Sequence, residues 1–532
     1  MCIVGGLIGG VWQPSAVRAQ TSPSVVKAIP APPLPVWPFR TNTLPAVRDV
    51  PEAFQPFVPD VATQVLFNPA RGVLNRQRFV YGSYNPGAVR LPSQVTGLSD
   101  APPDFVAMTR LGSARRPWLL WLGHRVSMTD NDLTSTTEEF DQRDDGFIAE
   151  HGRREGRNAI ENQAAYLRVV RGFPTWWGGA ALGFFGAYER ARRDDVERRI
   201  QRTQQRFEND PVLRLTINDL FLDADLFEDI DRLYVGMEYD AAGPGWDFVT
   251  TFSYQKTIFD EGFERLDLSS RTDSLVRFDT GEQVTVEDSR SSSAFLEAAS
   301  KPNLFRFNSY YQREVRLFTR RDHVFLMVDG QYGYGTYDQT RGESTTQTRI
   351  EDGTIIGEIA DLPPIFRLHS DIEEWQVYGS LGYVLPHRFD DFFLMTGVQG
   401  AFLYRDATDT SDELLTFSLT NPITVGDEIT AWHASLTVPV YLNYAVSKAF
   451  SLYGGVNVLY TYRNTRSELA QRVSLSVDQI TVVKQNNDQL SLRDEFYLGA
   501  TLRHPRGLAA QIAFNGDLAR TSQWSVAVGY QF

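Results

Sequence analysis

The sequence predicts an all-β protein whose strands close into a transmembrane antiparallel up-and-down barrel. Three observations support this fold class. Apolar and polar residues alternate in segment after segment from about residue 76. Short and long connectors take turns along the chain. The chain ends on a strand-like segment whose last residue is aromatic. With 42% hydrophobic and 22% charged residues, the chain is too apolar for a disordered protein and too polar for a helical membrane protein.

Composition also excludes several functional classes. The net charge of −14 argues against a nucleic-acid partner, and the single cysteine excludes a disulfide framework and a cysteine metal site. The seven histidines have no partner at metal-ligand spacing, and the chain has no GxSxG, P-loop or HExxH motif. We therefore expect no metal, no cofactor and no enzymatic activity.

The amino terminus, residues 1–19, resembles a signal peptide. Residues 3–12 form an apolar run of about ten residues, too short for a helix that spans a bilayer. Small residues follow at Val17 and Ala19, so we expect cleavage after Ala19. The alternative is a buried strand of the mature protein.

Residues 20–75 are expected to form a proline-rich periplasmic segment. Eleven of the 27 prolines lie between residues 21 and 70, which excludes regular sheet. Four large aromatic side chains in this segment are too apolar for a solvated linker: Trp37, Phe39, Phe54 and Phe57. One interpretation is a plug that enters the barrel, where each aromatic gains roughly 1.5–3 kcal/mol on burial. The other is a tether that binds a periplasmic protein.

Residues 76–532 are expected to form the barrel. In segments 246–258, 430–446 and 450–462, apolar residues occupy every second position. Successive side chains of a strand point to opposite faces, so one face is predicted to meet lipid and the other the lumen. Side chains predicted to face lipid include Phe248, Trp432, Val438 and Leu452, whereas Asp247, His433 and Asn443 are expected on the other face.

The connectors predict the strand count and the polarity of the barrel. Seven short connectors lie near 113–117, 172–175, 241–245, 319–322, 386–391, 447–449 and 503–507. Long connectors lie near 85–102, 129–160, 193–229, 260–303, 339–372, 406–428 and 465–489, five of them strongly acidic. Short periplasmic turns and long extracellular loops are typical of outer-membrane barrels, and this rhythm gives about 16 strands, or 14 or 18 if one hairpin is miscounted. Within one loop, the charged residues 194–209 suggest a short surface helix.

Charged residues on the predicted lumen face are the main candidates for function. They are Arg232, Glu238, Arg306, Glu314, Arg316, His323, Asp329, Arg493 and Glu495. Mixed charge inside a barrel either lines a water-filled path or forms ion pairs that brace the wall and hold a plug. The balanced signs favour bracing with a narrow path.

The carboxyl terminus carries a candidate assembly signal. Apolar residues alternate at Trp524, Val526, Val528, Tyr530 and Phe532. This segment resembles the terminal strand of Gram-negative outer-membrane barrels. The resemblance implies recognition by the barrel-assembly machinery, a location in the outer membrane, and contact with its lipid and lipopolysaccharide.

The motif Asn68-Pro69-Ala70-Arg71-Gly72 precedes the first strand and resembles the Asn-Pro-Ala-Gly element of the fatty-acid transporter (FadL-like) family. The resemblance implies an amino-terminal hatch inside the barrel and a hydrophobic solute that crosses through the lumen. Two functions follow as hypotheses. The first is a channel or transporter for a small solute. The second is a structural barrel that binds a surface partner and transports nothing.

Overall fold

The computed structural model describes residues 50–74 without residue 60, and residues 78–531 without 85–104, 415–422 and gaps of one to five residues between other strands. The predicted signal peptide (1–19), Trp37, Phe39 and Phe532 lie outside the described residues. Three short helices precede the strands: η2 (Glu52–Phe57), α1 (Val61–Phe67) and α2 (Arg71–Leu74). No helix in the described part of the chain has the length and apolar character needed to cross a membrane.

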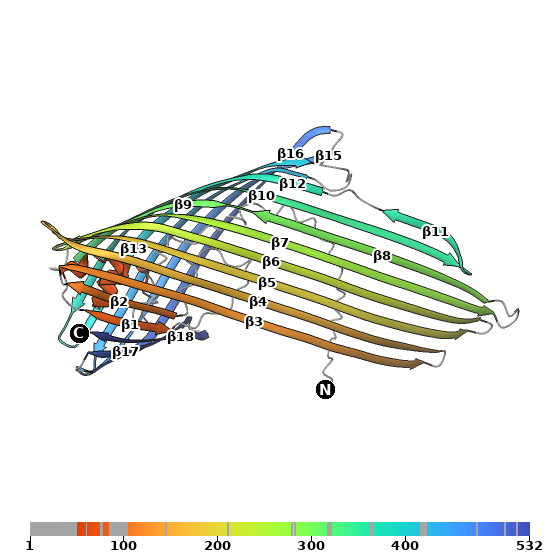
Figure 1. Cartoon of the computed structure of the whole chain (residues 1–532), viewed down its shortest axis with the longest axis horizontal. Coiled ribbons are helices and arrows are strands. Elements are labelled where there is room, and N and C mark those ends of the chain that lie inside the picture. The colour runs from red at the N-terminus through yellow and green to blue at the C-terminus, as the bar shows by residue number, and fades with distance from the viewer. Residues whose placement is uncertain are drawn as a thin grey trace.

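The strands form one antiparallel sheet that closes into a barrel (Figure 1). Their bounds are β1 (Phe79–Tyr84), β2 (Phe105–Ser113), β3 (Arg116–Arg143), β4 (Gly146–Thr175), β5 (Gly178–Asn209), β6 (Val212–Gly243), β7 (Trp246–Arg277), β8 (Gln283–Ser300), β9 (Asn303–Val315), β10 (Asp322–Glu351), β11 (Thr354–Asp361), β12 (Phe366–Arg388), β13 (Phe392–Leu414), β14 (Ile423–Ala445), β15 (Phe450–Ser474), β16 (Val477–Arg503), β17 (Leu508–Asp517) and β18 (Arg520–Gln531).

The closed wall has 16 strand positions, as predicted. β8 and β9 are two parts of one position, because both pair with β7 on one side and β10 on the other. β11 and β12 likewise share the position beside β10. The 18 strands therefore occupy 18 − 2 = 16 positions. β18 pairs with β1 from Phe79↔Gln531 to Tyr84↔Val526 and closes the ring.

Alternation places side chains as the sequence predicts. Trp432 and Leu452 are exposed on the outer face, whereas Asp247 is buried on the inner face. Inside, several aromatic rings lie against a glycine of the neighbouring strand, for example Tyr453 against Gly499. A side chain at such a glycine would occupy the space of the ring, so these glycines let large aromatics lie flat along the curved wall.

Aromatic residues mark a band on the outer face. On β14, Trp432 and Tyr444 are both outward and exposed, and they stand twelve positions apart. Twelve residues span about 40 Å along a strand, or about 30 Å of height after a typical barrel tilt. The edge of the band that contains Trp432 continues across neighbouring strands. The ring centroid of Tyr404 lies 4.4 Å from that of Trp432 and 4.8 Å from that of Trp375. Such a band matches the apolar girdle of a membrane barrel, about 25 Å tall.

Several strands extend far beyond this band (Figure 1). β5, β6 and β7 each have 32 residues, whereas a membrane crossing needs about ten. Most of the long connectors expected as loops are therefore paired strand. Within the described residues, β3 pairs with β2 only as far as His124, and β11 pairs with β10, so the described extension is a sheet that runs from β3 to β11 and is open at its β3 edge. Residues 194–209 belong to β5, and the predicted surface helix is wrong.

Cross-strand ion pairs explain why these charged segments form strands. Arg198 lies 3.2 Å from Asp223, and Arg202 lies 3.5 Å from Asp219, each pair joining β5 to β6 on the outer face. Opposite charges directly across an antiparallel pair stabilise the sheet by roughly 0.2–1 kcal/mol each. Because both faces of these strands carry charged residues, the sequence shows no alternation of apolar and polar residues here.

Candidate functional site

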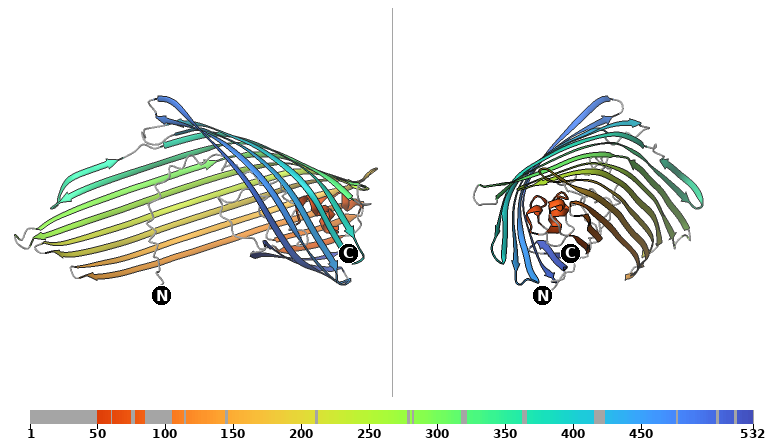
Figure 2. Two further views of the ribbon diagram at one scale, coloured as in Figure 1. Left: turned by 180° about the vertical axis from the view of Figure 1, so that it is seen from behind. Right: turned by 60° about the vertical axis from the view of Figure 1, so that its left-hand side comes forward.

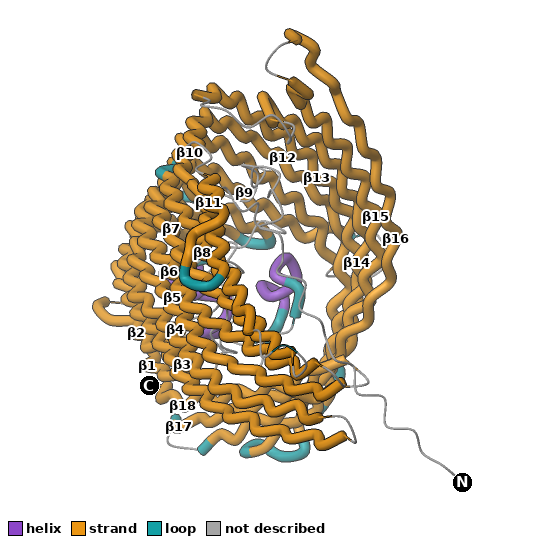
Figure 3. Tube along the Cα trace, turned by 90° about the vertical axis from the view of Figure 1, so that its right-hand side faces the viewer, coloured by secondary structure: helices purple, strands orange, loops and turns teal. Residues whose placement is uncertain are grey.

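The three helices lie inside the barrel, at the end that carries the short turns (Figures 2 and 3). We call residues 50–74 the plug. Its apolar residues are buried in the same cluster as lumen-facing residues of the wall, among them Tyr310 and Phe325. Phe54 is fully buried, and its ring makes an edge contact with Phe325 at 5.3 Å. Phe57 lies 4.9 Å from the ring of His323. The structure thus places two of the four predicted plug aromatics in the lumen.

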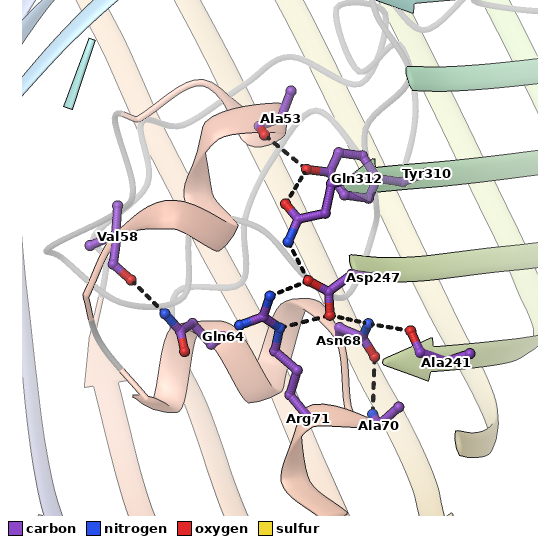
Figure 4. Close-up of polar contacts among 10 residues, drawn as sticks. All are labelled: Ala53, Val58, Gln64, Asn68, Ala70, Arg71, Ala241, Asp247, Tyr310 and Gln312. Atoms are coloured by element: carbon purple, nitrogen blue, oxygen red, sulfur yellow. Dashed lines mark hydrogen bonds and ion pairs between the residues drawn. The ribbon is translucent and has the colours of Figure 1, made fainter. Parts of the chain in front are cut away.

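One carboxylate of the wall, Asp247 on β7, anchors the motif that precedes the first strand (Figure 4). Asp247 Oδ1 accepts hydrogen bonds from Asn68 Nδ2 at 2.9 Å and from Arg71 Nε at 2.7 Å. Its second oxygen pairs with Arg71 Nη2 and accepts from the Gln312 side chain. Asp247 is 1% exposed and Arg71 is 29% exposed, so the carboxylate of this ion pair is buried, and its remaining lone pairs are hydrogen-bonded.

Asn68 also determines the local path of the plug. Its side-chain oxygen accepts a hydrogen bond from the backbone N–H of Ala70 at 3.0 Å, which forms the turn into α2. Its amide donates to the Ala241 carbonyl on β6 at 2.9 Å. One side chain therefore shapes the turn and attaches it to the wall, which gives a physical role to the first residue of the motif.

Two further arginines of the wall hold plug carbonyls. Arg168 on β4 donates to the Leu66 carbonyl at 2.9 Å. The same guanidinium binds Glu238 on β6 through two hydrogen bonds of 2.8 Å. Arg110 on β2 donates to the Gly72 carbonyl. Because Arg168 and Glu238 are buried and paired in a fixed fork geometry, they position the plug backbone rigidly.

Glycines make room for the plug where it touches the wall. A methyl group at Gly179 would collide with the Ala70 carbonyl oxygen, and one at Gly172 would lie 2.8 Å from a methyl of Val73. On the opposite wall, a methyl at Gly397 would meet the ring of Phe54. These close approaches explain why the wall has no side chain at these positions.

Most of the predicted lumen-facing residues do point inward. Arg232, Glu238, Arg306 and Asp329 are buried, and Arg306 Nε donates to Asp329 at 2.7 Å. Arg232 and Arg125 both form an ion pair with the carboxylate of Glu189, and Arg125 belongs to β3. Glu314 and His323 are partly buried. The side chains of Arg493 and Glu495 lie outside the described residues.

Arg316 differs from the other predicted lumen residues. β9 ends at Val315, so strand alternation no longer applies, and Arg316 is exposed at the turn end of the barrel. Alternation of the terminal strand is as expected for Val528 and Tyr530, which point outward. The side chain of Trp524 is outside the described residues.

Sequence reasoning missed several buried charges that complete the lumen network. Arg405 on β13 binds Glu374 on β12 through hydrogen bonds of 2.8 and 3.0 Å. Arg110, Arg125, Arg168 and Glu189 were likewise not identified. The signal for Arg168 was available, because it stands in phase with Tyr166 and out of phase with Leu167. In the described part of the chain, no group of three or more His, Cys, Asp or Glu residues is arranged to hold a metal ion.

Above the membrane band, two acids face one another on the lumen side. Glu228 on β6 is directly opposite Glu261 on β7. Burial raises the pKa of Glu228, with the nearby Arg193 opposing the shift. Burial and then the charge of Glu228 raise the pKa of Glu261. Arg193 lies 3.9 Å from Glu228 and is also paired with Asp195.

Comparisons with known proteins found only distant structural likeness. No family model and no curated protein matches it in sequence. Similar solved structures include a mutant of TodX, a monoaromatic hydrocarbon channel (11% identity, 88% of this chain and 93% of that chain, TM-score 0.26). Another is the ferric enterobactin receptor PfeA from Pseudomonas aeruginosa (8% identity, 86% and 80%, TM-score 0.22). A third is the transport unit of the autotransporter AIDA-I from Escherichia coli (12% identity, 61% and 91%, TM-score 0.21). We infer no substrate of this chain from these structures.

Proposed function

We propose that the protein is an outer-membrane channel or transporter for a small solute, with the plug limiting flow through the lumen. The observation that carries the proposal is the attachment of the plug inside the turn end of a closed barrel, through Asp247, Arg168 and Arg110. A barrel of about 16 strands encloses more space than its own inward side chains fill. The plug therefore occupies the path that a solute would take. The proposal includes no catalytic step and no cofactor.

The lumen wall favours a polar solute over the hydrophobic one that the family resemblance implies. Above the plug, the inward side chains include the Arg125–Glu189–Arg232 cluster and the pair Arg306–Asp329. These charged groups form ion pairs with each other, so this part of the lumen wall is polar, which suits water and hydrophilic solutes.

Conductance in planar bilayers tests the proposal. Deleting residues 21–74 should raise single-channel conductance while the barrel stays folded, as judged by heat-modifiable mobility on gels. Deleting residues 21–49 is the matched control, because it retains the whole described plug, and conductance should stay at the level of the full chain. Equal conductance of the two deletions would show that residues 50–74 do not limit flow.

The second candidate function is a surface barrel that binds a partner and transports nothing. The tall open sheet of β3 to β11 favours it, since a channel needs no wall so far above the membrane band. Silence of both the full chain and the 21–74 deletion in bilayers would support this candidate over the first.

A further inference from the structure

A cavity with both polar and apolar lining lies on the open sheet, far from the plug. Its volume is about 690 Å³, and residues of β5, β6, β7, β8, β10 and β11 line it. Gln201 in its lining stands 22 residues beyond Gly179 on β5, about 70 Å along the strand. The cavity is therefore separate from the plug and its anchors, and it belongs to the part of the wall above the membrane band.

Strand register arranges the lining side chains in two parallel rows. The first row, from β5 to β11, is Gln201, Leu220, Ser269, Arg290, Gln347 and Ile359. The second row is Thr203, Asn218, Arg271, Asp288, Arg349 and Gly357. Both rows share the face that continues the lumen wall, because Gln201 has the same parity as the buried Ala187 and Ala191 of β5.

Of the three arginines in these rows, two have an acidic partner among the described residues and one does not. Arg271 donates to Asp273 at 2.9 Å, and Arg349 lies 3.7 Å from Asp288. Arg290 stands between Ser269 and Gln347, and its side chain has no ion pair or hydrogen bond within the described ranges of the chain. An exposed guanidinium offers a planar fork of donors that matches a carboxylate or a phosphate.

The other lining groups suit a sugar. Gln347, Asn218, Ser269 and Thr203 supply amide and hydroxyl groups that exchange hydrogen bonds with sugar hydroxyls. Leu220 adds an apolar surface for the C–H face of a ring. The volume falls in the range of small-ligand sites, about 300–1,000 Å³.

We propose that this cavity binds an acidic saccharide, with Arg290 pairing its phosphate or carboxylate group. Such a ligand has two sources in reach of an extracellular wall: the phosphorylated core oligosaccharide of lipopolysaccharide and a polyuronate from outside the cell. The site is independent of the proposed channel, because neither the plug nor its anchors contribute to it.

Isothermal titration calorimetry on the full chain in detergent, at low salt, tests the proposal. The probes are lipid-free phosphorylated core oligosaccharide, the same oligosaccharide after enzymatic dephosphorylation, oligogalacturonate, and neutral maltooligosaccharide. We expect at least one acidic probe to bind, and the neutral and dephosphorylated probes to bind far more weakly. Binding of the phosphorylated core alone would identify the first source, and binding of oligogalacturonate alone the second.

Arg290→Ala should weaken binding by about tenfold or more, the typical effect of losing a hydrogen bond to a charged group. Arg290→Lys keeps the charge without the fork and should recover only part of the affinity. Arg198→Ala is the matched control, because Arg198 lies on the opposite face of β5. Its affinity should equal that of the unmodified chain.

Three results would overturn the proposal. They are the absence of binding by both acidic probes, equal affinity of neutral and acidic probes, and equal affinity of Arg290→Ala and the unmodified chain. Heat-modifiable mobility of each variant shows that the barrel is folded, so a loss of binding is attributable to the side chain.

Discussion

Replacing Asp247 by alanine should release the plug from the wall. The carboxylate is almost fully buried, and it is the common acceptor for Asn68, Arg71 and Gln312. Removing one partner of a buried ion pair typically costs 3–5 kcal/mol, because the other charge is left uncompensated. Arg71 is 29% exposed, so water recovers part of that loss and we expect about 3 kcal/mol. This corresponds to a shift of roughly 100-fold towards the undocked plug.

Trypsin provides the assay, because the Arg71–Gly72 bond is a cleavage site inside the anchor. In the native chain, the Arg71 side chain is held by Asp247 and the bond is protected. In Asp247→Ala, a new amino terminus at Gly72 should appear faster by a factor approaching the 100-fold shift, and channel conductance should rise. Asp247→Asn retains an acceptor without the charge and should fall between the two.

The matched control is Asp219→Ala, which removes an acid from an exposed outer-face pair with Arg202. It should leave both cleavage at Gly72 and conductance unchanged. Unaltered cleavage and conductance in a folded Asp247→Ala barrel would refute the reasoning, since the carboxylate would then not hold the plug.

Three further predictions follow from the wall. Val438→Arg should impair refolding into lipid vesicles by roughly 2–4 kcal/mol, because it places a charge towards hydrocarbon. Asn443→Arg places its charge towards the lumen and should cost much less. Equal costs would mean that the two faces of the strand are assigned the wrong way round. Gly179→Ala should displace the plug at a cost of about 1–3 kcal/mol and raise conductance, whereas Gly400→Ala, which has open space around it, should do neither. Because folding raises the pKa of Glu261, its protonation stabilises the folded sheet below the usual carboxyl pKa, and that stability is lost as pH rises through the raised value. Denaturant unfolding across this range should show the loss in the native chain and a smaller one in Glu261→Gln.

The alternation of apolar and polar residues was sufficient to predict the wall inside the membrane band. Alternation at Phe248 and Trp432 gave the lipid face, and the short connectors gave 16 strand positions, because hydrocarbon forces one face to be apolar. Above the band, water meets both faces, so charged residues stand on either side and the period disappears. Residues 194–209 were therefore misread, since the partners of Arg198 and Arg202 lie on another strand.

The contacts that anchor the plug to the wall could not be predicted from the sequence, for a different reason. Phe54 and Phe57 were predictable from their apolar character in a proline-rich segment. The pairing of Arg71 with Asp247 spans 176 positions, and that of Arg168 with the Leu66 carbonyl spans 102. No local pattern specifies which inward acid or carbonyl a given arginine meets. Only the curvature and register of the closed wall bring them together.

The distribution of these anchors has a consequence for the order of assembly. The plug is anchored by β2, β4 and β7, which follow it in the chain, whereas the seam that closes the ring joins Phe79 to Gln531. Pairing across such a sequence separation needs loop closure before any contact forms, so we expect it to form late. The plug can thus settle on the amino-terminal half of the wall while that half is still an open sheet. Closure of the seam then encloses it, and the chain never has to thread a finished pore.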